Sequence, residues 1–573
     1  MSANEFSLLS VMGSTVSEAP SERAATEADQ LATANWRRNR LALGASQKDV
    51  LAEIESAGPI GLTWIFARDG SLTAQDESGQ WWGKCSVPRA TARNLTRAFT
   101  AKGTVQCYLD PMHAAELAVT MDCLASHQAM IAIVPDAWRL GVMLRCGDFS
   151  AALEGGRLWF FTGLNWERQL ESLLDSLPGL PIPNQFVKTI FANEQTVGAM
   201  IDAAQGVFSR VTQRRGQKLE DLLADASTHE SAADSSDVLV VAPSRFGLWG
   251  LAGIALERAL VGKPSTTATG ETDRSWKRLD PDQPASASPL ALAMAAIECG
   301  AIVTADTGRS DLPGVVPMGC AWVTWITGPR VPARDVNAPR DAILLADAAW
   351  MDLALKAGWP KDRIGIAGWP VLCDECAGDR LGLIADVTEM LPPEAETNLS
   401  SQRLLWEFIR DELIRDPSAC EGDPAVYLSA RARKFAVDEE SLNPARFFDE
   451  LILPASAIGL ARVLIANGLP VKIWGTGWDK RPEFAKVHGG AIRSMSELSA
   501  AAGECAAIVH AWPTTWSHPI DALGKPVIRR RGRGMDGLIR SARAAISGVA
   551  ASAEPAATEK LSREGLMRRL LKA

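Results

Sequence analysis

The segment from residue 469 to residue 530 alternates short apolar runs with helix-patterned stretches, and this order constrains the fold more than any other feature of the chain. Val471–Trp474 is an apolar run that leads directly into the loop Gly475–Gly477. A helical stretch separates it from a second apolar run, Ala506–His510, and a short predicted helix precedes a third run at Val527–Ile528. Strand, loop, helix and strand in this order predict a parallel α/β layer. Ligands of such layers bind at the carboxyl ends of the strands.

Two elements of this segment resemble the C-terminal half of GT-B glycosyltransferases, especially the family that includes the bacterial spore-maturation-type glycosyltransferases. Trp474–Trp478, with the sequence WGTGW, matches the G-x-G-W loop that ends a strand in that family. Asp521–Ile528, with the sequence DALGKPVI, matches an acidic residue followed by A-x-G-x-P-V-I. The family uses this acid, usually Glu, to hold the ribose of the sugar donor. The resemblance covers about residues 236–545 and implies two Rossmann-like domains that face each other across a cleft.

The length of 573 residues allows about three or four domains. Residues 1–40 are rich in Ser, Ala, Glu and Thr and are expected to be a disordered or loosely helical tail. The resemblance makes residues 237–378 the acceptor-side Rossmann-like domain and residues 379–545 the nucleotide-sugar domain. Residues 546–573 hold a low-complexity segment and a predicted terminal helix.

Residues 41–226 are expected to form a smaller α/β region ahead of these two domains. Three apolar runs, Thr104–Leu109, Met130–Val134 and Arg157–Phe161, alternate with helical patterns, which predicts a β-α-β-α-β unit. No glycine-rich loop follows the first of these runs, so no dinucleotide cofactor is assigned to the region.

The same region is similar to the N-terminal region of motility-accessory-factor flagellin glycosyltransferases. Pro135-Asp136, Gly147–Ser150 and Leu153–Phe161 carry this similarity. We therefore expect the region to recognise the acceptor or a partner.

Charge and apolar content argue against several classes of protein. Lys+Arg 59 against Asp+Glu 68 gives a net charge of −9, so no basic field is expected to attract nucleic acid. No apolar run is long enough for a membrane span, and the N-terminus lacks a signal peptide's basic start and apolar core, so the expected location is the cytoplasm. The ten cysteines are scattered, and we interpret the lone C-x-x-C of Cys373 and Cys376 as two reduced thiols.

The middle of the chain holds the acceptor-side candidates. Val238–Ala242 is a predicted buried strand that runs into a loop. The candidates in this loop, which could contact phosphate or acceptor, are Ser244, Arg245 and Gly247. The Pro-, Ser-, Thr- and Asp-rich run Lys263–Ser288 is expected to be a surface excursion. It holds Asp280-Pro281-Asp282, the only Asp-x-Asp of the chain, with no strand before it, so no catalytic metal is expected.

The chemistry of glycosyl transfer from a sugar nucleotide suggests which residues of the nucleotide-sugar domain would bind the donor. The diphosphate leaving group gains negative charge, which backbone N–H groups and Lys or Arg side chains can stabilise. Asp521 is the candidate for the donor ribose, or else a helix cap. The other donor-binding candidates are Gly475 and Gly477 for close backbone approach, Lys480 and Arg481 for phosphate, and Thr514, Thr515 and His518 in the loop before Asp521. The Lys-Arg pair could equally be solvated, and the two threonines could be helix caps.

Two residues at predicted strand ends are catalytic candidates. Asp306 follows the strand Ala301–Ala305 and is the leading candidate for the base that activates the acceptor hydroxyl. His510 ends its own strand and can face the cleft, or be a satisfied rim residue. Thr327 stands where relatives often carry Asp, which leaves the identity of the base, and retention or inversion, open.

The sequence therefore predicts a metal-independent glycosyltransferase of the hexosyltransferase type. It would move a sugar from a nucleoside-diphosphate sugar to a protein or glycan acceptor, without a further cofactor. The alternative is a catalytically inactive GT-B module that binds or scaffolds, because the base is not identified and Asp521 replaces Glu. A methyltransferase-like activity of residues 104–163 is a third hypothesis, which the missing glycine loop disfavours.

Overall fold

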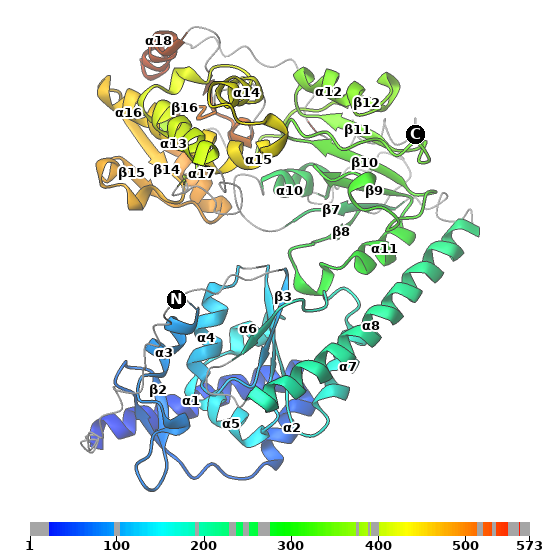
Figure 1. The fold of residues 1–573 in the computed structure, drawn as a ribbon, viewed down its shortest axis with the longest axis vertical. Coiled ribbons are helices and arrows are strands. Elements are labelled where there is room, and N and C mark those ends of the chain that lie inside the picture. Colours follow the sequence, from blue (N-terminus) through cyan, green and yellow to red (C-terminus); the bar gives the residue numbers. More distant parts are fainter. Residues whose placement is uncertain are drawn as a thin grey trace, which may run out of the picture. The chain divides into compact units, whose positions relative to one another are not determined.

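The structure is a computed structural model that describes residues 22–96, 103–125, 127–188, 194–228, 237–243, 251–261, 276–373, 378–387, 390, 400–512, 519–529, 534–547 and 561. The chain divides into two compact units, both of which combine helices with parallel β-sheet (Figure 1). Unit 1 comprises residues 1–222 and 281–292, and unit 2 comprises residues 223–280 and 293–573.

The main sheet of unit 1 has four parallel strands in the order β5-β4-β3-β6. In that order the strands are Leu158–Phe161, Ala129–Ile133, Val105–Leu109 and Phe186–Lys188. The helices between them are α4 (Ala114–Cys123), α5 (Ala137–Cys146), α6 (Ser150–Glu154) and α7 (Trp166–Ser176). The predicted β-α-β-α-β unit is confirmed. The sequence does not predict β6, whose three residues are too few to show a clear alternation.

Helices bury both faces of this sheet, and alternate residues of each strand point to opposite faces. Three helices besides those between the strands take part, namely α1 (Glu22–Ser46), α2 (Lys48–Ser56) and α8 (Glu194–Thr228). Tyr108 and Met130 pack on one face in a cluster with residues of α1, α2 and α5. Cys107 and Ile131 pack on the other face in a cluster with residues of α7 and α8.

A buried asparagine anchors α1. Asn39 Nδ2 donates to the carbonyl oxygens of Leu144 and Gly147, each 2.7 Å away, and Oδ1 accepts the Phe149 N–H at 2.8 Å. Residues 22–40, which the sequence analysis places in a loosely helical tail, thus form most of a helix that belongs to the core of unit 1. Their composition hides this role because the buried residues between positions 27 and 40 are alanines and asparagines rather than large apolar side chains.

Smaller elements complete unit 1. β1 (Thr63–Phe66) and β2 (Leu72–Gln75) form an antiparallel hairpin. Three short helices are η2 (Trp82–Lys84), α3 (Pro88–Thr96) and η4 (Pro284–Ser286). The returning segment 281–292 is fixed by Ser288, whose N–H donates to Gly179 O at 2.8 Å and whose Oγ donates to Pro178 O at 2.7 Å.

Unit 2 contains two parallel sheets. The six-stranded sheet has the order β12 (Ile364–Ile366), β11 (Ala342–Leu345), β10 (Ala321–Ile326), β9 (Ala301–Ala305), β7 (Val238–Val241) and β8 (Trp276–Leu279). The five-stranded sheet has the order β15 (His488–Gly490), β14 (Val471–Trp474), β13 (Arg380–Ile384), β16 (Cys505–Val509) and β17 (Val527–Ile528). The fold class predicted from the sequence is confirmed, since two Rossmann-like parallel sheets follow a smaller α/β region.

Helices cover these sheets as they cover the sheet of unit 1. The main helices are α10 (Leu251–Leu256), α11 (Pro289–Ile297), α12 (Met351–Lys356), α13 (Ser400–Arg415), α14 (Pro424–Lys434), α15 (Pro444–Phe447), α16 (Leu453–Ala466), α17 (Met495–Gly503) and α18 (Gly534–Ile546). In the five-stranded sheet, Leu383 and Ile473 pack in a cluster with α13, α16 and α18. Ile384 and Ile508 point the other way, into a cluster that includes α17 and residues of the six-stranded sheet.

The prediction that Lys263–Ser288 is a surface excursion is wrong for residues 276–288, and residues 263–275 lie outside the described residues. Trp276–Leu279 forms β8, which pairs in parallel with β7, and the segment that follows packs in unit 1. The polar composition around this four-residue strand conceals it, because an edge strand needs little apolar surface.

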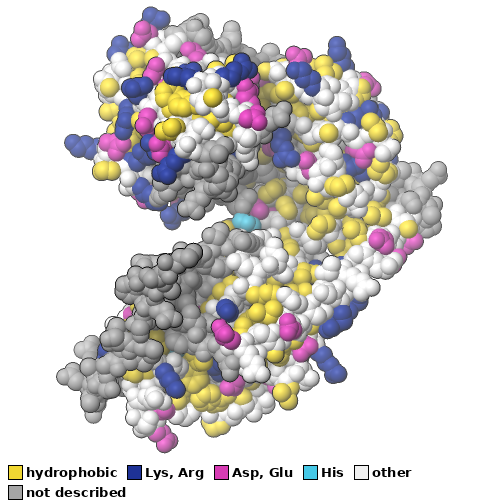
Figure 2. All heavy atoms as spheres, viewed as in Figure 1, with side chains coloured by type: hydrophobic (Ala, Val, Ile, Leu, Met, Phe, Trp, Pro, Cys, Tyr) yellow, Lys and Arg dark blue, Asp and Glu magenta, His cyan; other side chains and the backbone are white. Residues whose placement is uncertain are grey.

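The exposed surface mixes both signs of charge. Figure 2 shows Lys and Arg side chains interspersed with Asp and Glu side chains on the visible face. Among the helices of the described residues, none is long and apolar enough to cross a membrane.

A buried ion pair fixes the chain ahead of β10. Arg309 forms two parallel hydrogen bonds to Asp341, at 2.8 Å from Nε and 3.0 Å from Nη2, and the two side chains are only 4% and 3% exposed. The remaining Arg309 N–H groups donate to the carbonyl oxygens of Val316, Pro317 and Cys320 at 2.6–3.1 Å. Burial raises the pKa of Asp341, and Arg309 opposes that shift. The pair is therefore stable only because each charge has a partner.

Asp341→Asn is expected to lower the free energy of unfolding of unit 2 by about 3–5 kcal/mol, because it leaves the Arg309 charge buried without a counter-ion. Urea denaturation followed by tryptophan fluorescence measures the loss. The control is Arg330→Met, which breaks an exposed pair with Asp311 and should cost at most about 1 kcal/mol. Similar losses for the two variants would contradict the role assigned to the buried pair.

Candidate functional site

The carboxyl edge of the five-stranded sheet is the candidate site. The chain builds this sheet outward from β13, first through β14 to β15 and then, on the other side, through β16 to β17. The strand order therefore reverses at β13, which is where ligands bind in open parallel sheets. Polar or glycine residues lie just past the ends of these strands. Gly475–Gly477 follows β14 directly, His510 follows β16, Arg529 follows β17, and Asp386 is the second residue after β13.

Asp386 joins the loops that follow β13 and β14. Its Oδ1 accepts the Thr476 N–H at 2.7 Å and the Thr476 hydroxyl at 2.8 Å. The Val387 N–H donates to Thr476 O at 3.0 Å. The sequence analysis did not select Asp386 as a site residue, although an acidic residue just past the end of a buried strand was a usable signal. It is placed beside the predicted donor loop and is exposed enough to meet a ligand there.

The two glycines of the loop are required by the backbone of the chain itself. Gly475 and Gly477 have φ values of 133° and 81°, which favour glycine. A Cβ at Gly475 would lie 2.0 Å from Ala385 O, and one at Gly477 would lie 1.9 Å from Val387 O. The loop after β14 therefore packs directly on the loop after β13. The contact with phosphate expected of these glycines stays a prediction.

The basic residues after this loop differ in their surroundings. Gly477 precedes the short helix η11 (Trp478–Lys480), at whose end Lys480 is exposed. Arg481 is half-buried, and burial lowers its pKa while Glu483 opposes the shift. Trp478 is buried and donates from Nε1 to Ala385 O at 2.6 Å, so it belongs to the core rather than to a base-stacking surface.

Asp521 lies in the short helix η13 (Pro519–Leu523) and forms an ion pair with Arg529. The two side chains are 22% and 15% exposed, so the pair lies at the margin of the core. The sequence analysis did not select Arg529, whose only signal is its position directly after the last strand. Asp521 thus holds a cation of its own chain at the place where the resemblance puts the ribose-binding acid.

His510 is fully buried. Its backbone N–H donates to Ile528 O at 2.9 Å, and the centroid of its imidazole ring lies 6.0 Å from the ring centroid of Trp512. Its side chain is thus part of the packed interior beneath the sheet edge. The other candidates of the following loop, Thr514, Thr515 and His518, lie outside the described residues, as do the acceptor-side candidates Ser244, Arg245 and Gly247.

Asp306 lies at the corresponding edge of the six-stranded sheet, directly after β9. Its φ of 54° is left-handed, and its N–H donates to Trp325 O at 2.9 Å. Its carboxylate accepts the Thr327 N–H at 2.6 Å and also the Thr327 hydroxyl. Burial raises the pKa of Asp306, and the bonds to Thr327 oppose the shift. A carboxylate with a raised pKa is a stronger proton acceptor, as a general base must be.

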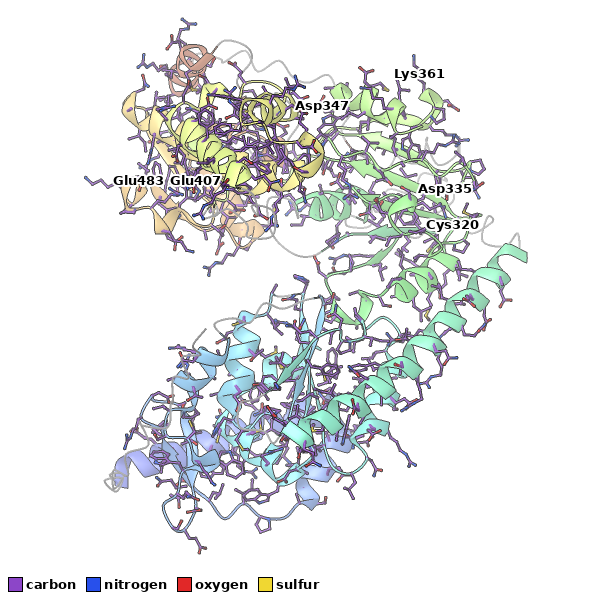
Figure 3. All side chains as sticks on the ribbon, viewed as in Figure 1. Cys320, Asp335, Asp347, Lys361, Glu407 and Glu483 are labelled. Carbon is purple, nitrogen blue, oxygen red and sulfur yellow. The ribbon has the colours of Figure 1, made fainter. Side chains whose placement is uncertain are left out.

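Two further observations bear on the chemistry of the site. Asp347, labelled in Figure 3, accepts the Ala349 N–H at 2.9 Å and so caps the helix after β11. Within the described residues, no three His, Cys, Asp or Glu side chains gather as a metal site would require.

Comparisons with known proteins give one distant likeness. No protein-family model matches the chain, and no curated protein matches it. Among solved structures, the chain is similar to the MAf glycosyltransferase from Magnetospirillum magneticum AMB-1, with 12% sequence identity and a TM-score of 0.25 over 60% of this chain and 57% of that one. The chain thus spans little more than half the length of that protein. Because the likeness is so distant, the proposals below rest on the described residues.

Gly477→Ala is expected to destabilise unit 2 by at least about 2 kcal/mol more than Gly468→Ala. Both glycines have left-handed φ values, 81° and 67°, so both variants pay the same backbone cost. A Cβ at Gly477 would clash with the Val387 carbonyl oxygen, whereas nothing lies within 4 Å of a Cβ at Gly468. Thermal unfolding of both variants measures the difference. Equal melting temperatures would show that the two loops do not need their close approach.

Proposed function

We propose that this chain is a glycosyltransferase that transfers a hexose-type sugar from a nucleoside-diphosphate sugar to a protein or glycan acceptor. The observation that carries the proposal is the strand order of the five-stranded sheet, which reverses at β13 beside the joined Asp386–Thr476 loops. Nucleotides bind at such reversals in parallel sheets. The motif resemblance of Trp474–Trp478 and Asp521–Ile528 points to the same edge.

Residues 379–545 would form the donor side of the enzyme. Asp521 would bind the ribose, and Arg529 would hold its carboxylate in place. Lys480 and Arg481 would stabilise the charge that the diphosphate gains as the glycosidic bond breaks, together with the loop of Thr514, Thr515 and His518. In this proposal the positive side chains replace a divalent metal.

Residues 237–378 would form the acceptor side, with Ser244, Arg245 and Gly247 in its first loop. Asp306 would take the proton of the acceptor hydroxyl, with Thr327 as the residue that orients the carboxylate. His510 is the weaker catalytic candidate, because a fully buried ring reaches substrate only if the sheet edge opens. Residues 41–226 would recognise the acceptor or a partner.

A catalytically inactive binding module is the second candidate function. It is favoured by the observation that Thr327 and Arg529 already occupy the carboxylates of Asp306 and Asp521. Purified protein incubated with a panel of UDP- and GDP-sugars separates the two functions. An enzyme releases the nucleotide from at least one donor at a slow rate, whereas an inactive module releases it from none.

Asp306→Asn is expected to lower sugar transfer about 10²- to 10⁴-fold while the fold is kept or slightly stabilised. Because its pKa is raised above 3.8, the ionised Asp306 costs stability as the pH rises from that value through its folded pKa, and Asn removes this cost. Asn also tolerates the left-handed backbone, and its Oδ1 can accept the Thr327 N–H while its NH2 group donates to the Thr327 hydroxyl oxygen. Transfer of labelled sugar into acceptors of a cell extract, together with the melting temperature at pH 7, measures both effects. Unchanged transfer would exclude Asp306 as the base.

Asp521→Asn is expected to weaken the binding of a nucleoside diphosphate about ten- to a hundredfold. A charge-assisted hydrogen bond to a ribose hydroxyl contributes about 1.5–3 kcal/mol. Calorimetric titration with UDP and GDP gives the affinity. Asp347→Asn is the matched control, because this carboxylate caps a helix and should not affect nucleotide binding. Wild-type affinity in the Asp521 variant would make that residue a structural partner of Arg529 only.

A further inference from the structure

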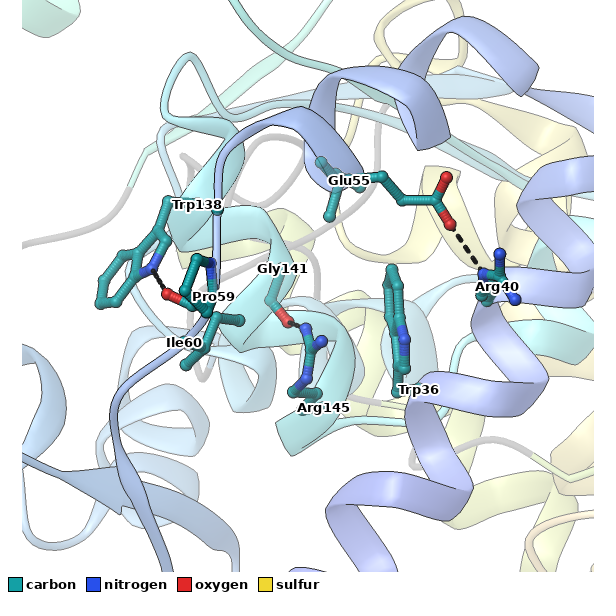
Figure 4. Close-up of a pocket in the computed structure, with 10 residues that line it drawn as sticks. Trp36, Arg40, Glu55, Pro59, Ile60, Trp138, Gly141 and Arg145 are labelled. Carbon is teal, nitrogen blue, oxygen red and sulfur yellow. Dashed lines mark hydrogen bonds and ion pairs between the residues drawn. The ribbon is translucent and has the colours of Figure 1, made fainter.

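Unit 1 contains a cavity that neither the sequence motifs nor the proposed donor site explains. It has a volume of about 440 Å³ and lies between α1, α5 and the end of α2 with the loop that follows (Figure 4). This volume is within the range of small-molecule sites, about 300–1,000 Å³. Its wall combines two tryptophans, Trp36 and Trp138, with Arg145 and an apolar floor.

Arg145 supplies a positive charge to this cavity. Its guanidinium carbon lies 4.3 Å from the centroid of the Trp36 ring, and Nη1 donates to Gly141 O at 2.8 Å. Among the described residues no carboxylate pairs with it. Burial lowers the pKa of Arg145, as expected for a cation that has lost part of its hydration. A bound anion would compensate for that loss.

The second arginine of the cavity is already neutralised. Arg40 Nε lies 2.7 Å from Glu55 Oε1, and the two side chains are 57% and 44% exposed. A dashed line marks this ion pair in Figure 4. Because its two charges are opposite, the pair adds no net charge at the rim of the cavity. The charge that selects a ligand is that of Arg145.

The other residues that line the cavity favour a ligand with a flat or apolar part. Trp138 donates from Nε1 to Pro59 O at 3.2 Å, so its polar atom is satisfied and its ring remains as an apolar surface. Ile54 and Ile60 line the floor with Gly141. A Cβ at Gly141 would lie 3.2 Å from an Ile54 methyl group and 3.4 Å from Ile60, so a larger residue here would press on the side chains of the floor.

We propose that this cavity binds a small organic anion, with its carboxylate or phosphate group on the Arg145 guanidinium and an apolar or aromatic body between the two tryptophans. The proposal is independent of the glycosyltransferase assignment, because all of the residues involved belong to unit 1 and the donor candidates belong to unit 2. It holds whether or not the chain transfers sugar.

Binding of simple probes to the full chain tests the proposal. Benzoate and phenyl phosphate carry the two anionic groups on the same ring, and benzyl alcohol is the uncharged analogue. At least one anion is expected to bind with a Kd below about 10 mM, and at least tenfold more tightly than the alcohol. The anion that binds more tightly identifies the carboxylate or the phosphate as the preferred group. Calorimetry or the fluorescence change of the tryptophans gives the affinities.

Matched variants locate the binding. Arg145→Met keeps the aliphatic stem but removes the charge, and should weaken anion binding at least tenfold without affecting the alcohol. Gly141→Ala should also weaken anion binding, because its methyl group enters the cavity 3.5 Å from Arg145 Nη1, and it needs only a small shift of Ile54. The double variant Arg40→Gln/Glu55→Gln leaves the net charge unchanged and should keep the affinity within about threefold.

Two results would overturn the proposal. One is the absence of binding of both anions to the wild-type protein at about 10 mM. The other is wild-type affinity in both the Arg145→Met and the Gly141→Ala proteins, since that would place the bound anion elsewhere. Melting temperatures of both variants show whether a loss of binding comes with a loss of the fold. UDP and GDP titrations, which report on unit 2, keep this test separate from that of the proposed function.

Discussion

The central strands of the four-stranded and six-stranded parallel sheets are buried on both faces, and this constraint determines where polar chemistry can occur. β3, β4 and β10 have no exposed residue along their length, so a charge within them would need an internal partner. The polar residues instead follow the strands, where the chain reaches the sheet edge. Asp110 and Asp306 stand directly after a strand, and Asp386 stands one residue further on. The carboxyl edges of the sheets are therefore where polar side chains can meet a ligand.

Much of the fold could be predicted because it depends on local patterns. Apolar runs bounded by glycine and aspartate identify β3, β4, β9 and β10, and the alternation with helices implies parallel pairing. The elements that escaped prediction depend on contacts distant in sequence. β8 is a strand only because β7 lies beside it, and α1 is a core helix only because Asn39 finds its partners more than a hundred residues away. No local pattern contains that information.

At the candidate site, too, the contacts of individual side chains could not be predicted from the sequence. A sequence motif located Gly475, Gly477 and Asp521 at the sheet edge, but not what each residue contacts. The glycines accommodate backbone from the β13 loop, and the aspartate holds Arg529. Both features are compatible with a nucleotide site, since a loop must be rigid before it can present its N–H groups. The location of these residues at the sheet edge could thus be predicted from the sequence, whereas the residues that they contact became known only from the three-dimensional structure.

The return of residues 281–292 to unit 1 has a consequence for how the protein could be divided. The chain leaves unit 1 after α8, forms β7 and β8 in unit 2, and comes back before β9. The fit is tight, since a Cβ on Gly179 would lie 1.8 Å from Ala285 O. A shortened protein that starts after α8 would carry this segment without the surface it packs on, and a fragment that stops at α8 would lack it. One cut in the gene cannot release either unit whole, so the two units have to be inherited, expressed and engineered as a single piece.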